Sequence, residues 1–155
     1  MQTIIAIDPG TDKSGVACYF DGKLVELKTL TLPSLVEFTK EVDGVFVVED
    51  VEANSFMYAR NTHHKAAAQS KMAQGVGMVK GTARHILEFL AYQNKAIVKI
   101  APRSGNWGTI KPAVGSRHLA ATTGWTGKSN KDTRSAAYFG WVYLQQLKYQ
   151  RRAEQ

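Results

Sequence analysis

The feature that most constrains the fold of this chain is a two-residue turn between two strand-like runs. Asp21-Gly22 separates residues 15–20 from residues 24–30, and both runs are rich in apolar residues. An Asp-Gly pair is typical of a tight hairpin, because its two residues tolerate the positive φ angles that such a turn requires. Residues 2–7 form another buried run just before them. The chain is therefore expected to begin as an antiparallel meander of three strands.

The rest of the pattern predicts alternating helices and strands. Residues 32–42 have the spacing of a short helix that Ser34 can cap. Residues 44–50 form a second buried strand, which is expected to lie parallel to the first because a helix separates it from the meander. The further predicted elements are a long helix over residues 62–92, a strand over 96–101, and helices over 113–122 and 131–150.

This order of elements matches an α/β fold of the RNase H-like type, with a five-stranded mixed sheet in the order 3-2-1-4-5 flanked by helices. We assign one domain to residues 1–150 and a basic C-terminal tail to residues 151–155. No apolar run reaches the roughly 18 residues that a membrane span needs, and no signal peptide is recognisable. The only cysteine, Cys18, excludes an internal disulfide and is expected in the core. These features predict a cytoplasmic protein with no membrane partner.

The basic residues are concentrated in the second part of the chain. The net charge is +7, but residues 1–60 contain ten acidic and five basic residues, whereas residues 61–155 contain three acidic and fifteen basic residues. A strongly basic part of a protein favours a polyanionic partner such as nucleic acid. The alternative is a basic surface that is simply solvated.

Two buried strands end in a carboxylate. Asp8 ends the first strand, just before Pro9 and Gly10, and Glu49 follows the buried run that begins at Gly44. If these two strands are parallel neighbours, their carboxyl ends meet and the two side chains face each other. Carboxylates held close together repel each other unless a cation neutralises them. Mg²⁺ is the natural cation, because it prefers oxygen ligands.

A third carboxylate, Asp132, lies in the first turn of the last predicted helix, after a glycine-rich loop from which it can swing onto the site. Three carboxylates on separate elements outline a two-metal phosphodiester site. Structural roles remain as alternatives: Asp8 can start a turn, Glu49 can be an exposed strand end, and Asp132 can cap a helix. Other acids nearby in the sequence can substitute or assist, namely Asp12, Asp50 and Glu52.

Five segments resemble the motifs of one known family. They are, in order, IIAIDPGTDKSGVA, VVED, QSKMAQGVGMVKG, IAPRSGNWGTIKPAVG and KDTRSAAY. They are similar to the two acidic strand motifs, the long-helix segment, the following strand and basic stretch, and the final helix of RuvC-type Holliday junction resolvases. The resemblance covers about residues 3–145 and is nearest to the small phage-encoded branch of that family.

The resemblance implies that Asp8, Glu49 and Asp132 are catalytic metal ligands for Mg²⁺-dependent cleavage of Holliday junctions and related branched DNA, such as forks and flaps. It implies two ions, with Mn²⁺ as a substitute. It also implies a homodimer, which suits two symmetric cuts, and the host cytoplasm if the protein is phage-encoded. Where the family usually has a fourth acid, this chain has Ser135, whose hydroxyl can share the helix face of Asp132.

Basic and aromatic side chains are candidates for holding the DNA. We expect phosphate contacts foremost from Lys111, Lys128 and Lys131, because their loops flank the proposed site. Phe56 and Tyr58 can stack on bases at a branch point or pack on the core. The other basic candidates are Lys80, Arg84, Arg103, Arg117 and Arg134.

Two other functions compete with a nuclease. The first is a catalytically weak branched-DNA-binding protein with the same fold, which Ser135 favours. The second is an ATP-binding domain of the sugar kinase and Hsp70 type, in which a strand also ends in a stretch like DPGT. Such proteins close two copies of this motif over a nucleotide, and this chain has one copy.

Overall fold

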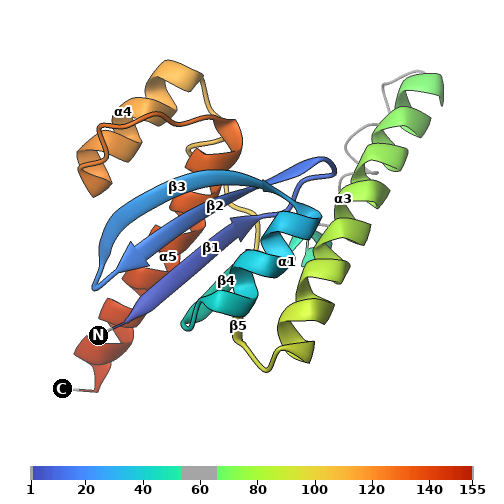
Figure 1. Ribbon diagram of the computed structural model, residues 1–155. Coiled ribbons are helices and arrows are strands. Elements are labelled where there is room, and N and C mark those ends of the chain that lie inside the picture. The colour runs from blue at the N-terminus through green and yellow to red at the C-terminus, as the bar shows by residue number, and fades with distance from the viewer. Residues whose placement is uncertain (1, 54–65, 155) are drawn as a thin grey trace.

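The computed structural model describes residues 2–53 and 66–154 (Figure 1). The five strands form one sheet in the order β3-β2-β1-β4-β5, which confirms the predicted fold class and strand order. The elements are β1 (Thr3–Asp8), β2 (Lys13–Phe20), β3 (Lys23–Thr31), α1 (Leu32–Glu41), β4 (Val45–Glu49), η1 (Val51–Ala53), α3 (Ala66–Tyr92), β5 (Ala96–Ile100), α4 (Pro112–Thr123) and α5 (Lys131–Ala153).

The meander forms as predicted. β2 pairs antiparallel with both β1 and β3. The turn between β2 and β3 has positive φ at Asp21 (48°) and Gly22 (81°), which is the backbone geometry that an Asp-Gly hairpin provides. The local sequence therefore determines how the first three strands pair.

β1 and β4 are parallel neighbours at the centre of the sheet. Ile4 lies opposite Val45, and Ile7 lies opposite Val48. The two strands can run parallel because α1 provides the crossover between them. β4 also pairs in parallel with β5, with Glu49 opposite Ile100. The carboxyl ends of these three strands therefore lie at one edge of the sheet.

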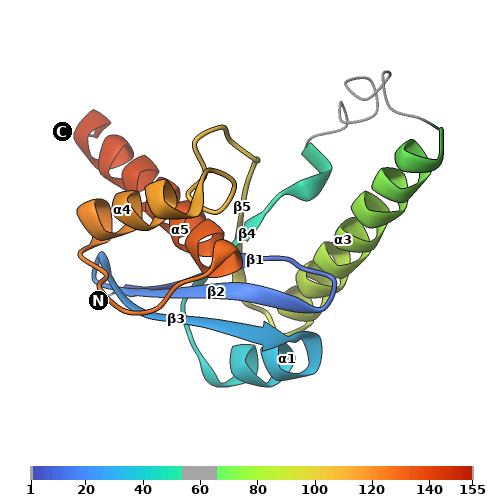
Figure 2. The same ribbon diagram turned by 90° about the horizontal axis from the view of Figure 1, so that it is seen from above.

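Helices cover both faces of the sheet. α1 and α3 lie on one face, and α4 and α5 lie on the other (Figure 2). Alternate residues of the central strands enter two separate cores, because successive strand side chains point to opposite faces. Ile5 and Phe46 pack with Leu90 of α3 in one core. Ala6 packs with Phe139 of α5 in the other.

α5 lies directly on the meander. At Gly140 a side chain would collide with the ring of Tyr19, so the helix backbone can approach the sheet only because this residue is glycine. The Tyr19 hydroxyl donates a hydrogen bond of 2.6 Å to the carbonyl of Ala137 in the same helix. These contacts fix where the first turn of α5 meets the carboxyl edge of the sheet.

Among the described residues most element ends lie within two residues of the predictions, and two differences concern named residues. Thr31, not Ser34, caps α1: its hydroxyl accepts a hydrogen bond from the Ser34 amide, and Pro33 occupies the first turn. α5 continues to Ala153, so Arg151 and Arg152 lie in its last turn and not in a tail. Cys18 is buried as predicted. Among the described helices, none combines the length and apolar character needed to cross a membrane.

Candidate active site

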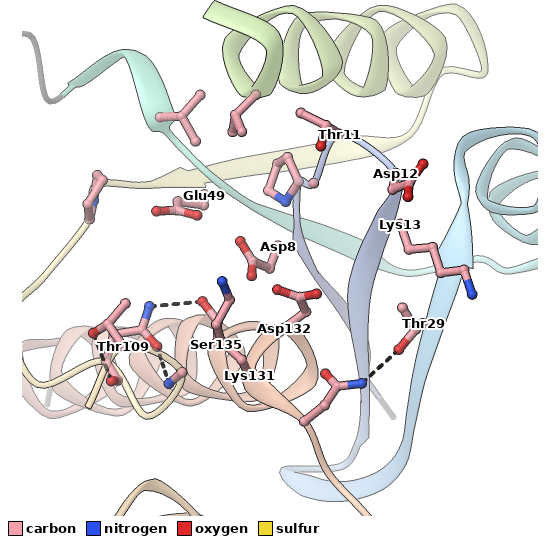
Figure 3. Close-up of a pocket in the computed structure, with 18 of the residues that line it drawn as sticks. Asp8, Thr11, Asp12, Lys13, Thr29, Glu49, Thr109, Lys131, Asp132 and Ser135 are labelled. Atoms are coloured by element: carbon pink, nitrogen blue, oxygen red, sulfur yellow. Dashed lines mark hydrogen bonds between the residues drawn. The ribbon is translucent and has the colours of Figure 1, made fainter. Parts of the chain in front are cut away.

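The structure brings Asp8 and Glu49 together, as predicted from the strand ends. Each is the last residue of its strand, and Ile7 of β1 pairs with Val48 of β4. The next residues of these two parallel strands are therefore adjacent. In Figure 3 the Asp8 and Glu49 side chains extend into the same cleft, with Ser135 and Asp132 of α5 across from Asp8.

The environment of this pair opposes negative charge. Burial, the adjacent Glu49 and the charge of Asp132 raise the pKa of Asp8 well above its ordinary value of 3.8, while a hydrogen bond with Ser135 acts in the opposite direction. Burial also raises the pKa of Glu49, and its hydrogen bond with Asp8 partly offsets this effect. Two carboxyl groups in this position ionise together only if a positive charge joins them.

Asp132 enters the cleft from the first turn of α5. Asn130 caps this helix through a reciprocal pair of hydrogen bonds with Thr133, and its amide also donates a hydrogen bond of 3.2 Å to the Thr29 hydroxyl of β3. Gly15 of β2 touches the Asp132 backbone so closely that a Cβ atom would collide with the carbonyl oxygen. The third carboxylate is therefore positioned by backbone contacts with the meander.

Ser135 is held by a residue that the sequence analysis missed. Asn106 donates a hydrogen bond of 2.9 Å from its side-chain amide to the Ser135 hydroxyl oxygen. Its own side-chain oxygen accepts a hydrogen bond of 2.8 Å from the Gly108 amide. Asn106 is 4% exposed. Its only sequence signal is a place in the loop before Trp107-Gly108, which does not identify its partner.

The cleft around these residues has a volume of about 1270 Å³. Asp12, Lys13, Lys80 and Lys131 are among its lining residues. Within the described chain, no Lys, Arg or His side chain forms an ion pair with Asp8, Glu49 or Asp132. The acids therefore face a space bordered by lysines that do not neutralise them directly.

The donor chemistry of this cleft fits a hard divalent cation. Three carboxylates and one hydroxyl offer oxygen ligands of the kind that Mg²⁺ and Mn²⁺ take. In the part of the chain that the structure describes, no three acidic, His or Cys side chains converge tightly enough to surround one ion. Asp8 and Glu49 thus form the close pair, and Asp132 needs a side-chain movement to join them.

The other candidate acids lie apart from this pair or have partners. Asp12 is exposed and lines the same cleft. Glu52 is engaged in an ion pair with Arg84, which also accounts for one of the basic candidates. Asp50 is not among the residues that line the cleft, and its backbone amide pairs with the carbonyl of Ile100.

The predicted DNA contacts are distributed over a wider surface than expected. Lys131 and Lys80 line the cleft. Lys111, expected to flank the site, lines a separate hollow between α4 and α5. Phe56 and Tyr58 lie outside the described residues, so the prediction for them remains a prediction. The exposed basic candidates elsewhere are Arg103, Arg117 and Lys128.

The structure buries Arg134, which was predicted to contact DNA. This side chain is 5% exposed. Its guanidinium donates hydrogen bonds of 3.3 Å to the Trp107 carbonyl and to the Ser129 hydroxyl. The helix face of Arg134 is covered by the loop before α4, and the guanidinium joins this loop to the start of α5. In this conformation Arg134 has a structural role, and its contact with DNA stays a prediction.

Comparison with known proteins identifies related folds. The sequence matches none of the protein-family models and none of the curated proteins. RuvC of Thermus thermophilus, in complex with a Holliday junction substrate, has a TM-score of 0.62 at 11% identity over 96% of each chain. A second Thermus thermophilus RuvC structure has a TM-score of 0.58 at 12% identity, again over 96% of each chain. At this identity the similarity establishes a shared fold.

A third structure is more distant. The yeast mitochondrial Holliday junction resolvase Ydc2 has a TM-score of 0.48 at 13% identity, over 97% of this chain and 84% of that one. The two RuvC structures show the fold, a five-stranded mixed sheet of the RNase H-like type, and the order of the elements predicted it.

Proposed function

We propose that this protein is a Mg²⁺-dependent, structure-selective endodeoxyribonuclease that cleaves Holliday junctions and related branched DNA. The observation that supports it most directly is the half-buried Asp8–Glu49 pair at the ends of adjacent parallel strands, with Asp132 facing the same cleft. Such a pair is unfavourable without a cation. The likeness to RuvC, solved in complex with a Holliday junction substrate, supports the choice of substrate.

In this proposal Asp8, Glu49 and Asp132 hold two divalent ions, and Ser135 contributes its hydroxyl. When bound, the ions supply activation of water and stabilisation of the leaving oxygen. The carboxylates orient these groups at the carboxyl edge of the sheet, where open α/β sheets commonly bind their ligands. Ser135 is neutral, so this site has one negative charge fewer than a site with four acids.

The basic residues provide the grip on DNA. Lys131 and Lys80 line the cleft itself and are suited to the phosphates next to the scissile bond. Contacts of this kind are salt-dependent and do not depend on base sequence. A homodimer would present two such clefts to a four-way junction, one for each symmetric cut.

Ser135 supports one second candidate. A hydroxyl anchored by Asn106 is a weaker metal ligand than a carboxylate, so the same fold is also suited to a protein that binds branched DNA and cuts it poorly. Binding without incision, in Mg²⁺ and in Mn²⁺, would distinguish this candidate from a nuclease.

The test is a gel assay on a labelled synthetic four-way junction, with a fork and a linear duplex beside it. We expect paired nicks near the branch in Mg²⁺, none in chelator, and none with Asp8→Asn, which should still bind the junction. Asp43→Asn is the matched control, because Asp43 is a fully exposed acid outside the cleft. Equal cutting by Asp8→Asn and the unmodified protein would contradict the proposal.

A further inference from the structure

A second hollowed surface lies on the far side of the loop that borders the cleft. It consists of two adjoining hollows of about 520 and 530 Å³, which share Tyr138 and Trp141 of α5. Trp107 and Lys111 line the first hollow, and Tyr149 lines the second. We call these two hollows together the outer groove.

The outer groove follows one face of α5. Tyr138, Trp141, Gln145 and Tyr149 are spaced three or four residues apart, so they form a stripe along the helix. At about 1.5 Å per residue, the stripe from Tyr138 to Tyr149 is about 16 Å long. The sheet-facing side of α5 contains Gly140 instead, so the groove points away from the sheet.

One loop separates the outer groove from the candidate active site. In residues 102–110, Asn106 and Gly108 line the cleft, whereas Gly105 and Trp107 line the outer groove. The Trp107 ring packs against Trp141, with ring centroids 5.6 Å apart. A strand that leaves the cleft over this loop enters the outer groove directly.

The net positive charge of the protein lies in the segment that supplies the lining of this groove. Residues 101–155 contain nine basic and two acidic residues, a net charge of +7, whereas residues 1–100 contain eleven of each. No acidic residue of the described chain lines either hollow. The basic residues that line them are Arg103, Lys111, Lys148 and Arg152.

Aromatic side chains are accessible between these cations. Tyr149 is 77% exposed, whereas tyrosine side chains are usually more buried than this. Trp141 is partly exposed. Aromatic faces alternating with Lys and Arg are the features with which proteins bind unpaired nucleic acid, because bases stack on the rings and phosphates contact the cations. A duplex keeps its base faces covered and leaves Tyr149 without a partner.

We propose that the outer groove binds an unpaired segment of DNA. Bases stack on Trp141 and Tyr149, and Lys148 and Arg152 neutralise the phosphates. This binding needs neither the carboxylates nor a divalent cation. Because the groove lies beside the cleft, the segment that it binds is the strand displaced at a branch point. Only this identification of the strand rests on the proposed function.

Fluorescence anisotropy of a labelled 12-nucleotide oligothymidylate, in chelator, tests the proposal. We expect Tyr149→Ala to weaken binding about tenfold. Tyr92→Ala is the matched control, because Tyr92 is 88% exposed at the end of α3. This variant should bind the oligonucleotide with unchanged affinity. For a duplex of equal length, Tyr149→Ala should change the affinity less than twofold.

The cations are tested through the salt dependence of the same binding. The double variant Lys148→Gln/Arg152→Gln should reduce the slope of log affinity against log salt by about 1.4, since each single-strand phosphate contact contributes about 0.7. Lys23→Gln/Lys40→Gln, on the meander and on α1, should leave the slope unchanged. Circular dichroism checks that each variant is folded.

Equal affinity of Tyr149→Ala and Tyr92→Ala for the oligonucleotide would overturn the proposal. So would a change in sedimentation of Tyr149→Ala without loss of affinity, which would mean that the groove seats a second copy of the chain. If the protein binds the oligonucleotide in chelator but cuts no junction in Mg²⁺, the proposed function is contradicted and this inference stands. If the protein cuts junctions in Mg²⁺ but Tyr149→Ala does not weaken binding of the oligonucleotide, the proposed function stands and this inference is overturned.

Discussion

A side-chain hydrogen bond joins Asn106 to Ser135 at the wall of the cleft. Its side-chain amide donates to the Ser135 oxygen over 2.9 Å, and the exposed fractions of the two residues are 4% and 5%. The Ser135 oxygen accepts this bond, and the hydroxyl proton is left to be donated to another acceptor. A hydrogen bond between Ser135 and Asp8 lowers the pKa of the Asp8 carboxyl, opposite to the effect of burial. Asn106, which also lines the cleft, thus holds the hydroxyl whose hydrogen bond favours the ionised form of Asp8.

Removing Asn106 should destabilise the wall of the cleft. Asn106→Ala leaves the buried Gly108 amide without its acceptor, which costs about 1–3 kcal/mol of unfolding free energy. Urea unfolding followed by circular dichroism measures this loss. Ser104→Ala, which removes a side-chain hydroxyl from an exposed residue of the same loop, should cost less than about 0.5 kcal/mol. Similar losses for the two variants would show that Asn106 is not a support of the site.

A carboxylate at position 135 should lower the stability of the metal-free protein and raise its affinity for divalent metal. Ser135→Asp adds a fourth acid beside Asp8, so repulsion should lower the melting temperature in chelator. The same charge should tighten Mn²⁺ binding by about tenfold, measured by isothermal titration calorimetry. Ser135→Ala adds no charge and provides the comparison. If Ser135→Asp bound Mn²⁺ no better than Ser135→Ala, position 135 would lie too far from the ions to act as a ligand.

The stability of the metal-free protein should depend on Asp8 and on pH. The raised pKa of Asp8 means that the folded protein binds this proton more tightly than the unfolded chain does, so ionisation opposes folding. The penalty is full above the folded pKa and fades as the pH falls toward 3.8, the ordinary value of the carboxyl. Asp8→Asn should therefore raise the melting temperature in chelator.

The size of that increase separates Asp8 from other titrating groups. It should amount to about 2–4 °C per kcal/mol relieved at pH 8 and shrink toward zero near pH 4. Differential scanning calorimetry at one-unit pH intervals gives the comparison, with Glu41→Gln, at an exposed acid that ends α1, as the control. An increase that stays constant between pH 8 and pH 4 would show that the gain has another origin.

Glycine is required at position 15 but not at position 77. Gly15→Ala places a Cβ atom against the Asp132 carbonyl, so the first turn of α5 must move away from β2. We expect loss of both incision and stability. Gly77→Ala meets no atom within 4 Å and should stabilise α3 by about 1 kcal/mol. Junction cleavage and thermal melting of the two variants test the contrast. Unimpaired cleavage by Gly15→Ala would show that the position of Asp132 tolerates a shift.

Lys131 and Arg134 should affect DNA binding differently. Lys131 is exposed and lines the cleft, so Lys131→Gln should reduce the salt slope of junction binding by about 0.9 with little loss of stability. Arg134 is buried against the Trp107 carbonyl, so Arg134→Gln should lower the melting temperature and leave the slope unchanged. Anisotropy titrations at several salt concentrations distinguish the two. A reduced slope for Arg134→Gln would place this residue on the DNA surface.

The parts of the structure that follow from local signals could be predicted from the sequence. The Asp21-Gly22 turn determines the meander, and the buried runs that end in Asp8 and Glu49 give the strands and two site residues. Their proximity then follows from the crossover between β1 and β4. Thr31 as the cap of α1 was missed because Ser34 has equal capping propensity, and only the position of Pro33 distinguishes them.

The contacts of the loop before α4 could not be predicted, because they join residues far apart in sequence. Asn106 and Ser135 are 29 residues apart, and no periodic pattern relates them. Arg134 has the charge and the place of a DNA contact. Helical periodicity does not reveal that Trp107 and its loop cover that face of α5. Lys111 was placed beside the cleft for the same reason, since the path of the loop decides which hollow it lines.

The backbone contact between Gly15 and Asp132 means that the site depends on two parts of the chain that are made at different times. Asp8 and Glu49 are synthesised well before the helix that brings Asp132 and Ser135. The Tyr19–Ala137 hydrogen bond that docks this helix spans 118 residues. Under the proposed function, nascent or truncated chains have the strands without the helix and are harmless to DNA.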